Sequence, residues 1–275
     1  MHVAVQAIDR EIWRDGATSD GTRLIPEETP IALTYNGGTH AVMMGTPQNL
    51  EDFAVGFSLS EGIVRSADDI QSLDVIRLDD GIELRMWLAQ ENAERINERR
   101  RHIAGPTGCG ICGIDSIAEA VRPAELVPRG RTFTSEDITA AMQGIAPLQA
   151  INMQTRAVHA AAFWSPARGI IALREDVGRH NALDKLAGAL ARSRTDASDG
   201  MVLLTSRVSV EMVQKTAAIG APVMVAISAP TALAVRTAQA AGITLIAIAR
   251  SDGFEVFTHG GRVAVCCATE VADVA

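Results

Sequence analysis

Two cysteines separated by two residues, Cys109 and Cys112, lie in the glycine-rich run GPTGCGICG. Thiols at this spacing can both face one small electrophile, and the flanking glycines leave room for a bulky substrate to approach. A thiolate attacks sulfane sulfur or a disulfide, and its reactivity depends on nearby positive charge and on exposure. The pair therefore favours covalent sulfur chemistry. The basic run at 99–101 is a candidate source of the positive field, although an ordinary solvated surface is its alternative.

Half of a structural zinc site is the main alternative for the cysteine pair. Such a site needs two more ligands, and the adjacent Cys266 and Cys267 have the wrong spacing for a second knuckle. We expect those two to be buried, inert thiols on a terminal strand. Zinc-dependent deamination needs an H-x-E motif, and none of the six histidines has Glu two residues later. That chemistry is excluded.

A second polar cluster, EDVGRHNALDK at 175–185, has the composition of an anion-binding helix start. If Gly178 opens a helix, the free N–H groups of the first turn, together with Arg179 and His180, suit a phosphate. His180 and Asp184 lie one helical turn apart, so we expect them to pair.

The turn Ser206-Arg207-Val208-Ser209 offers similar chemistry, with one cation and two hydroxyl groups between a predicted strand and a predicted helix. We expect Ser206 and Arg207 to contribute to the same anion site and Ser209 to cap the helix. For both segments the alternative is a polar helix start whose groups are satisfied within the protein.

The composition indicates a globular protein. The 275 residues are 47% hydrophobic and 21% charged, with a net charge of −8, which argues against general nucleic-acid binding. We find no signal peptide and no uninterrupted apolar run long enough to cross a membrane. Four cysteines are too few for a disulfide scaffold. We expect a cytoplasmic protein in a reducing compartment, without membrane or nucleic-acid partners.

The chain divides into four predicted parts. We expect a loose N-terminal segment (1–26), a small α+β domain (27–102), a Gly-rich C-x-x-C linker (103–131) and an α/β domain (132–275). In the small domain, two hairpins flank one helix; their predicted strands and helix are 31–35 with 39–44, 73–78 with 82–88, and 49–60.

In the α/β domain, short apolar strands alternate with helices, which implies a sheet covered on both faces. We expect a terminal hairpin from 254–257 and 262–267. The other predicted strands are 169–173, 201–204, 223–227 and 243–249, and the helices are 135–146, 178–191, 209–218 and 231–240.

Taken in order, six motifs resemble the formate dehydrogenase accessory sulfurtransferase family, FdhD. The combination is specific, and it extends from about residue 27 to residue 259. The motifs are EETPIALTYNG (27–37), GFSLSEGI (56–63), ERRR with AGPTGCGICG (98–113), HAAA (159–162), EDVGRHNALDK (175–185) and SRVSVEMVQK (206–215).

The resemblance implies a homodimer whose α/β domain has a cytidine-deaminase-like layered fold. It implies transfer of sulfur from a cysteine desulfurase to the molybdenum cofactor of formate dehydrogenase, bis-molybdopterin guanine dinucleotide, with GDP as a ligand mimic and no structural metal. The persulfide-bearing cysteine falls on Cys109, with Cys112 as its partner. The cofactor-binding stretch falls on Ile248, Ala249, Arg250, Ser251, Asp252 and Gly253.

The chain departs from the family pattern at three places. Arg156 stands where the family has Gly, Arg174 where it often has His, and Ile248 where it usually has Phe, with Gly253 in place of an Arg near the end of that stretch. A non-catalytic chaperone that only shields the cofactor, with the cysteine pair as a clip, is the functional alternative. A zinc-stabilised binding module is a third.

Overall fold

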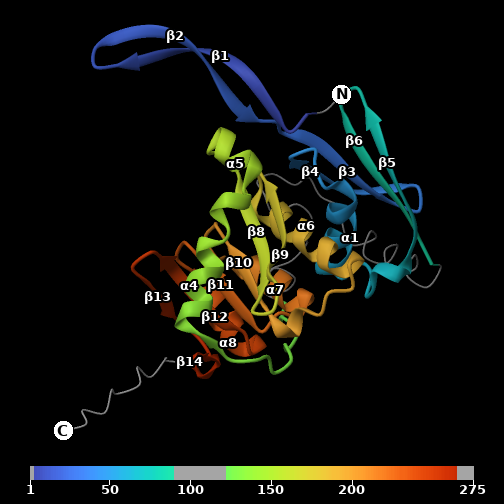
Figure 1. Ribbon diagram of the computed structural model, residues 1–275. Coiled ribbons are helices and arrows are strands. Elements are labelled where there is room, and N and C mark those ends of the chain that lie inside the picture. Colours follow the sequence, from blue (N-terminus) through green and yellow to red (C-terminus); the bar gives the residue numbers. More distant parts are fainter. Residues whose placement is uncertain (1–2, 90–121, 265–275) are drawn as a thin grey trace.

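The computed structural model describes residues 3–89 and 122–264 (Figure 1). Three parts are apparent: a long two-stranded arm at the N-terminal end, a four-stranded sheet with one helix, and a six-stranded sheet with helices on both faces. No helix within the two described ranges is long and apolar enough to span a bilayer.

The N-terminal segment is an ordered arm. Strands β1 (Val5–Arg14) and β2 (Ala17–Pro26) pair in antiparallel register over their whole length, so the prediction of a loose segment is wrong. Asp15 and Gly16 join them with φ values of 51° and 76°. Two left-handed residues make the tight turn that matches the twist of a hairpin, and Asp-Gly is a favoured pair for it.

The small domain has the two predicted hairpins and the predicted helix. Its strands are β3 (Thr29–Tyr35), β4 (Gly38–Gly45), β5 (Ile70–Leu78) and β6 (Gly81–Leu88), in the order β4-β3-β6-β5. The central strands β3 and β6 run parallel. Their buried side chains, among them Leu33 and Leu84, form a core with Phe53 of helix α1 (Leu50–Ser60).

The α/β domain is built on a six-stranded sheet in the order β13-β12-β11-β10-β8-β9. Strand β8 is not among the predicted strands. The strands are β8 (His159–Ser165), β9 (Gly169–Asp176), β10 (Met201–Leu204), β11 (Val223–Ala226), β12 (Thr244–Arg250) and β13 (Gly253–Val256).

Helices cover both faces of this sheet, as predicted. Val202 and Leu204 of β10 pack with three helices in one core, and Met201 and Leu203 pack on the other face with α4. Alternate residues are therefore buried on opposite sides, which explains the continuous apolar strands. The helices are α4 (Ser135–Gln143), the short α5 (Ala150–Thr155), α6 (Arg179–Arg192), α7 (Val210–Ile219) and α8 (Ala232–Ala241).

The predicted C-terminal hairpin is wrong. Strand β13 turns back at Ser251 and Asp252 to pair with β12, whereas β14 (Val263–Ala264) pairs in parallel with β7 (Phe133–Thr134). The chain reverses before residue 254 instead of after residue 257. Cys266 and Cys267 lie outside the described residues.

The two domains share helix α1, which packs against its own sheet and crosses α6 closely. A Cβ atom at Gly56 would lie 1.7 Å from the backbone oxygen of Asp184, and one at Gly188 would lie 1.9 Å from that of Asp52. Only glycine allows this approach of the two backbones. Arg174, one of the departures from the family pattern, strengthens the junction through its Nε, 2.8 Å from the Oδ2 of Asp52.

Candidate functional site

The candidate site lies at one edge of the six-stranded sheet. Strands β9, β10, β11 and β12 run parallel, because β8 is antiparallel to both β9 and β10 and the other neighbours pair in parallel. Their carboxyl ends therefore meet at the same edge, where α6, α7 and α8 begin. In open α/β sheets, ligands bind outside the carboxyl ends of the strands. We call this region the carboxyl edge.

Two helices begin at the carboxyl edge without a side-chain cap. Gly178 precedes α6 and Ser209 precedes α7, and neither provides a capping hydrogen bond, which corrects the prediction that the Ser209 side chain caps α7. In contrast, the hydroxyl of Thr231 at the start of α8 accepts from the N–H of Ala234. Because no side chain caps α6 or α7, the N–H groups of their first turns can donate to a ligand, and the positive end of each helix dipole favours an anion there.

Asp176, at the end of β9, holds the start of α6 in place. Its Oδ1 accepts from the N–H of Gly178 at 2.8 Å and from the Asn181 amide at 3.0 Å. Its Oδ2 accepts from Lys185 Nζ at 2.6 Å and from the N–H of Thr46 at 3.0 Å. Sequence reasoning missed this role, although Asp176 and Lys185 nine residues apart around a helix start offered a hint.

His180 has a different neighbour from the one predicted. Asp184 accepts hydrogen bonds from Ser60 and Lys215, and His180 instead lies with its Nε2 3.9 Å from the Oε2 of Glu211 on α7. The neighbouring His180 lowers the pKa of Glu211 to about 2. The predicted pairing with Asp184 is wrong, because Asp184 faces the α1 and α7 side of the helix.

His159 begins β8 directly opposite Asp176 of β9, at the carboxyl edge. Burial lowers the pKa of its ring, and the positive charge of Arg179 acts in the same direction. A lowered pKa favours the neutral imidazole near pH 7. The motif HAAA contains this residue, but nothing in its spacing indicated that it would face the start of α6.

The other predicted site segments follow β10 and end β12. Arg207 is exposed, and the Ser206 hydroxyl donates to its backbone oxygen. Ile248 has a φ of 53°, inside the irregular stretch where β12 and β13 shift register. Positive φ is unusual for a β-branched residue, and strain of this kind gathers at functional sites. Arg250 is exposed at the end of β12.

Backbone hydrogen bonds join the loops at this edge. The N–H of Val208 donates to the oxygen of Ala229, and the N–H of Ile248 donates to that of Ser228. The structure thus brings the segments containing Arg179, Arg207 and Arg250 to one edge. Cys109 and Cys112 lie outside the described residues, as does the basic run at 99–101, so the structure does not place them relative to this edge.

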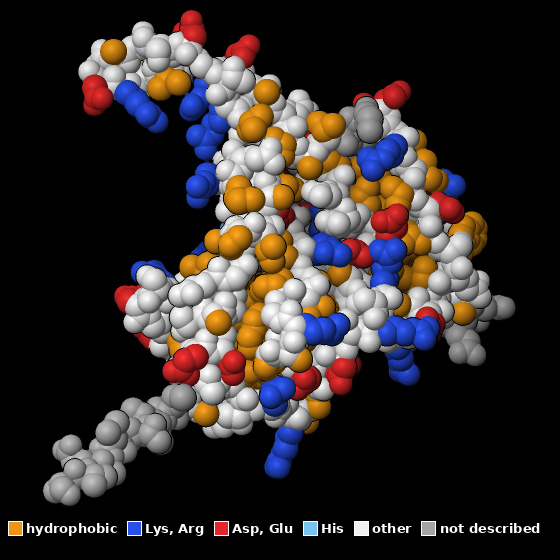
Figure 2. Space-filling view, viewed as in Figure 1, with side chains coloured by type: hydrophobic (Ala, Val, Ile, Leu, Met, Phe, Trp, Pro, Cys, Tyr) orange, Lys and Arg blue, Asp and Glu red, His pale blue; other side chains and the backbone are white. Residues whose placement is uncertain are grey.

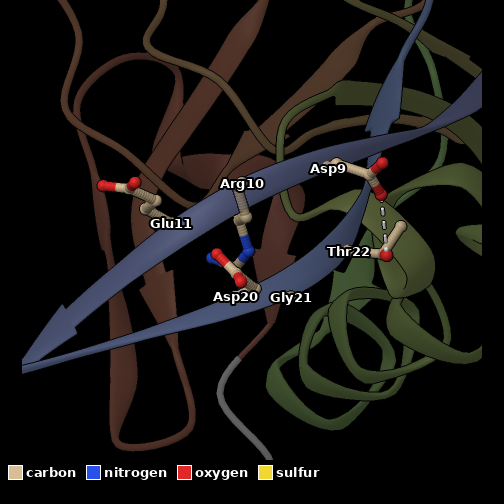
Figure 3. Close-up of a pocket in the computed structure, with 6 residues that line it drawn as sticks. All are labelled: Asp9, Arg10, Glu11, Asp20, Gly21 and Thr22. Carbon is tan, nitrogen blue, oxygen red and sulfur yellow. Dashed lines mark hydrogen bonds between the residues drawn. The ribbon is translucent and has the colours of Figure 1, made fainter.

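A separate hollow of about 640 Å³ lies along the arm, lined by Asp9, Arg10, Glu11, Asp20, Gly21 and Thr22 (Figure 3). One ribbon forms all of it, and the Thr22 hydroxyl donates to Asp9 within it. Its four charged side chains come from both faces of the ribbon, with Asp9, Glu11 and Asp20 on the face opposite to Arg10. Within residues 3–89 and 122–264, no group of three or more His, Cys, Asp or Glu is arranged to hold a metal ion.

The sequence profile of the FdhD/NarQ family matches residues 26–264. This chain belongs to that family. A relative from Agrobacterium fabrum, named sulfur carrier protein FdhD, is 49% identical over 264 residues, which cover 96% of this chain and 97% of the relative. Its namesake from Brucella abortus is 51% identical over 263 residues, or 94% of this chain and 98% of that one.

A solved structure shares the fold. It comes from Desulfotalea psychrophila and is provisionally described as a formate dehydrogenase accessory protein. The two superpose with a TM-score of 0.75 at 24% identity, over 95% of this chain and all of the other. The mixed α/β architecture of the FdhD/NarQ chain is therefore one already seen by crystallography.

Proposed function

We propose that this protein is a sulfur carrier for formate dehydrogenase, and that it transfers sulfur to the molybdenum cofactor of that enzyme. Membership of the FdhD/NarQ family and the names of the half-identical relatives support the carrier role. The sequence supports the chemistry, since Cys109 and Cys112 form a C-x-x-C pair in the motif shared with FdhD proteins.

In the first step, the Cys109 thiolate attacks the terminal sulfur of a persulfide on a cysteine desulfurase. The sulfur–sulfur bond of the donor breaks, the donor cysteine leaves as a thiolate, and Cys109 becomes a persulfide. No electrons are gained or lost overall. Arg99-Arg100-Arg101 precede the cysteine pair in sequence and are our candidates for stabilising the thiolate.

In the second step, the terminal sulfur passes as hydrosulfide to molybdenum of the substrate, bis-molybdopterin guanine dinucleotide, where it replaces an oxygen ligand that leaves as hydroxide. We assign Cys112 the resolving role: its thiolate attacks Cys109 and releases hydrosulfide, and a Cys109–Cys112 disulfide remains. The sulfur then has the oxidation state of a sulfido ligand. Two equivalents of a cellular thiol reduce the Cys109–Cys112 disulfide to two thiols and are themselves oxidised to a disulfide.

The observation that carries the substrate assignment is the carboxyl edge. Two uncapped helix starts and the segments of Arg179, Arg207 and Arg250 come together there, which suits the diphosphate groups of a guanine dinucleotide. GDP is the corresponding ligand mimic. We further infer a cytoplasmic location. The family resemblance implies a homodimer and a cytidine-deaminase-like layering of the α/β domain, in which a hairpin is followed by helix–strand units.

Cys109→Ser tests the carrier mechanism directly. Serine has nearly the size of cysteine but cannot form a persulfide, so incubation with a desulfurase and cysteine should leave the variant without the added mass of one sulfur atom. Cys112→Ser is the matched control, which should load sulfur and fail in onward transfer. Loading is read by intact mass, and transfer by formate dehydrogenase activity. If Cys109→Ser restores that activity fully, the protein acts as a cofactor-shielding chaperone and the carrier mechanism is wrong.

A further inference from the structure

The two faces of the β1–β2 arm carry opposite charges. Residues directly opposite in an antiparallel ribbon share a face, and successive residues of a strand alternate between faces. The register places Arg10 opposite Gly21 and Glu11 opposite Asp20. Within the paired strands, all arginines therefore lie on one face and all carboxylates on the other. The arginine face holds Arg10, Arg14 and Arg23, and the acidic face holds Asp9, Glu11 and Asp20.

The arginines of the arm are available to a ligand. Arg10, Arg14 and Arg23 are exposed, and none of them has an ion-pair partner among the residues that the structure describes. Ordinary surfaces intersperse charges of both signs. A face with one sign alone is a surface that attracts the opposite charge.

The arginine face turns toward the body of the protein. The guanidinium of Arg23 donates to the backbone oxygen of Thr155, the last residue of α5, at 3.2 Å. Figure 2 shows a hollow between the arm and the α/β domain, with Lys and Arg side chains gathered on the underside of the arm and along the wall below it.

Positive groups continue from the base of the arm to the carboxyl edge. Arg156 follows Thr155 and is exposed. His159 opens β8 three residues later, opposite the end of β9, and its neutral ring adds no charge. The next cation is Arg179, which lies close enough to lower the pKa of that ring. Arginines of the arm and of this wall thus border one hollow, and both would attract a negatively charged ligand placed between them.

We propose that the arginine face of the arm binds phosphate groups of a ligand whose other end is held at the carboxyl edge. The ligand class, a guanine dinucleotide with several phosphates, rests on the proposed function. The length of the arm supports binding of one ligand by both the arm and the carboxyl edge. The ten residues of β1 extend about 33 Å, farther than one nucleoside diphosphate reaches. The arm then holds the distal half of the substrate, while the helix starts hold the proximal half.

The test compares two probes on the full-length protein. GDP reports on the carboxyl edge alone, and diguanosine tetraphosphate reports on the edge together with the arm. The variant is Arg10→Gln with Arg14→Gln. Its control, Arg65→Gln with Arg77→Gln, removes the same charge from exposed positions of the small domain. Affinities are measured by calorimetry at low and high salt, and folding is checked by thermal melting.

The arm variant should bind the tetraphosphate about ten-fold more weakly than wild type at low salt, with the difference reduced at high salt. Its GDP affinity and both affinities of the control should be unchanged. An equal loss in the control would overturn the proposal, since a general field would then explain it.

Other outcomes separate the two hypotheses. Unchanged tetraphosphate affinity in the arm variant overturns the arm proposal alone, provided that wild type binds GDP. Wild-type protein that binds neither probe overturns both the arm proposal and the guanine site of the proposed function. If the arm variant binds both probes normally but no longer accepts sulfur from the desulfurase, the arginine face belongs to a protein partner and the proposal is wrong.

Discussion

Charged side chains at the junction of the two domains and on the arm are in opposite situations. Lys185 and Asp176 have no exposed side-chain surface and lie 2.6 Å apart, whereas Arg10 and Arg14 are exposed with no ion-pair partner among the described residues. A buried charge is costly unless it is paired and hydrogen-bonded. An exposed charge stays hydrated, so leaving it unpaired costs little free energy when no ligand is bound. The junction therefore fixes geometry, and the arm remains open to binding.

A second buried lysine follows the same rule at the junction. Lys215 of α7 donates to Ser60 and Glu61 at the end of α1 and to Asp184 of α6, each at 2.9 Å. Burial alone would lower the pKa of Lys215, but the two carboxylates outweigh it and raise the pKa. One cation thus joins three helices. Because α6 and α7 both start at the carboxyl edge, the network fixes their relative placement.

The largest effect is expected from Lys185→Met. Loss of the lysine leaves Asp176 buried and short of one donor, which should lower the free energy of unfolding by about 3–5 kcal/mol. The measurement is urea denaturation. Arg77→Met, at an exposed position, is the control and should change stability by no more than about 0.5 kcal/mol.

A double variant sharpens that result. Lys185→Met with Asp176→Asn removes both charges, so it should recover part of the stability lost in the single variant. GDP binding should be weaker than in wild type, because Asp176 no longer holds the start of α6 in place. A loss below about 1 kcal/mol in the single variant would show that the junction is not held by this pair.

Gly56→Ala should have the next largest effect. The new methyl group would lie 1.7 Å from the backbone oxygen of Asp184, so α1 and α6 must separate, and we expect a loss of about 3 kcal/mol. Gly144→Ala is the control, since its nearest new contacts are at 3.4 Å. Equal melting temperatures for the two variants would contradict the close crossing.

Most strands and helices could be predicted because their patterns are local. Strand β10 was predicted residue for residue from its apolar run MVLL, and the helix starts from Gly178 and Ser209. Asp15-Gly16 is a hairpin signal that could have indicated the arm. Most side chains of its two strands are exposed, so the hydrophobic pattern did not reveal them. Strand β8 was missed because three alanines follow His159 in HAAAFWS, and alanine is depleted in strands.

The candidate site was predictable as segments but not as an arrangement. The residues after β9 and β10 and at the end of β12 were named from composition and motif, and only sheet topology places them at one edge. The partners of His180 and Asp184 could not be deduced from helical spacing, since α1 and α7 supply competing groups from distant positions. Burial of Lys185 and Lys215 likewise depends on tertiary packing.

Arg156 directly follows Thr155, the residue that Arg23 of the arm contacts. Its substitution should have the smallest effect on stability, and it distinguishes a structural role from a binding role. Arg156 ends α5 with a φ of 59°, a conformation that costs an ordinary residue about 1 kcal/mol and glycine almost nothing. Arg156→Gly, which restores the residue expected from the family pattern, should therefore raise stability by up to about 1 kcal/mol. Arg156→Asn is the control, because asparagine tolerates this conformation and also lacks the charge.

If Arg156 helps to attract the phosphates that lie between the arm and the carboxyl edge, both substitutions at residue 156 should weaken binding of diguanosine tetraphosphate. They should leave GDP binding unchanged. Stability and affinity then move in opposite directions for Arg156→Gly, which a purely structural role would not produce. The measurements are the melting temperature and calorimetric affinity of each variant. Tighter or unchanged binding of diguanosine tetraphosphate would show that Arg156 does not contribute to ligand binding with the arm. The anion site would then be limited to the carboxyl edge.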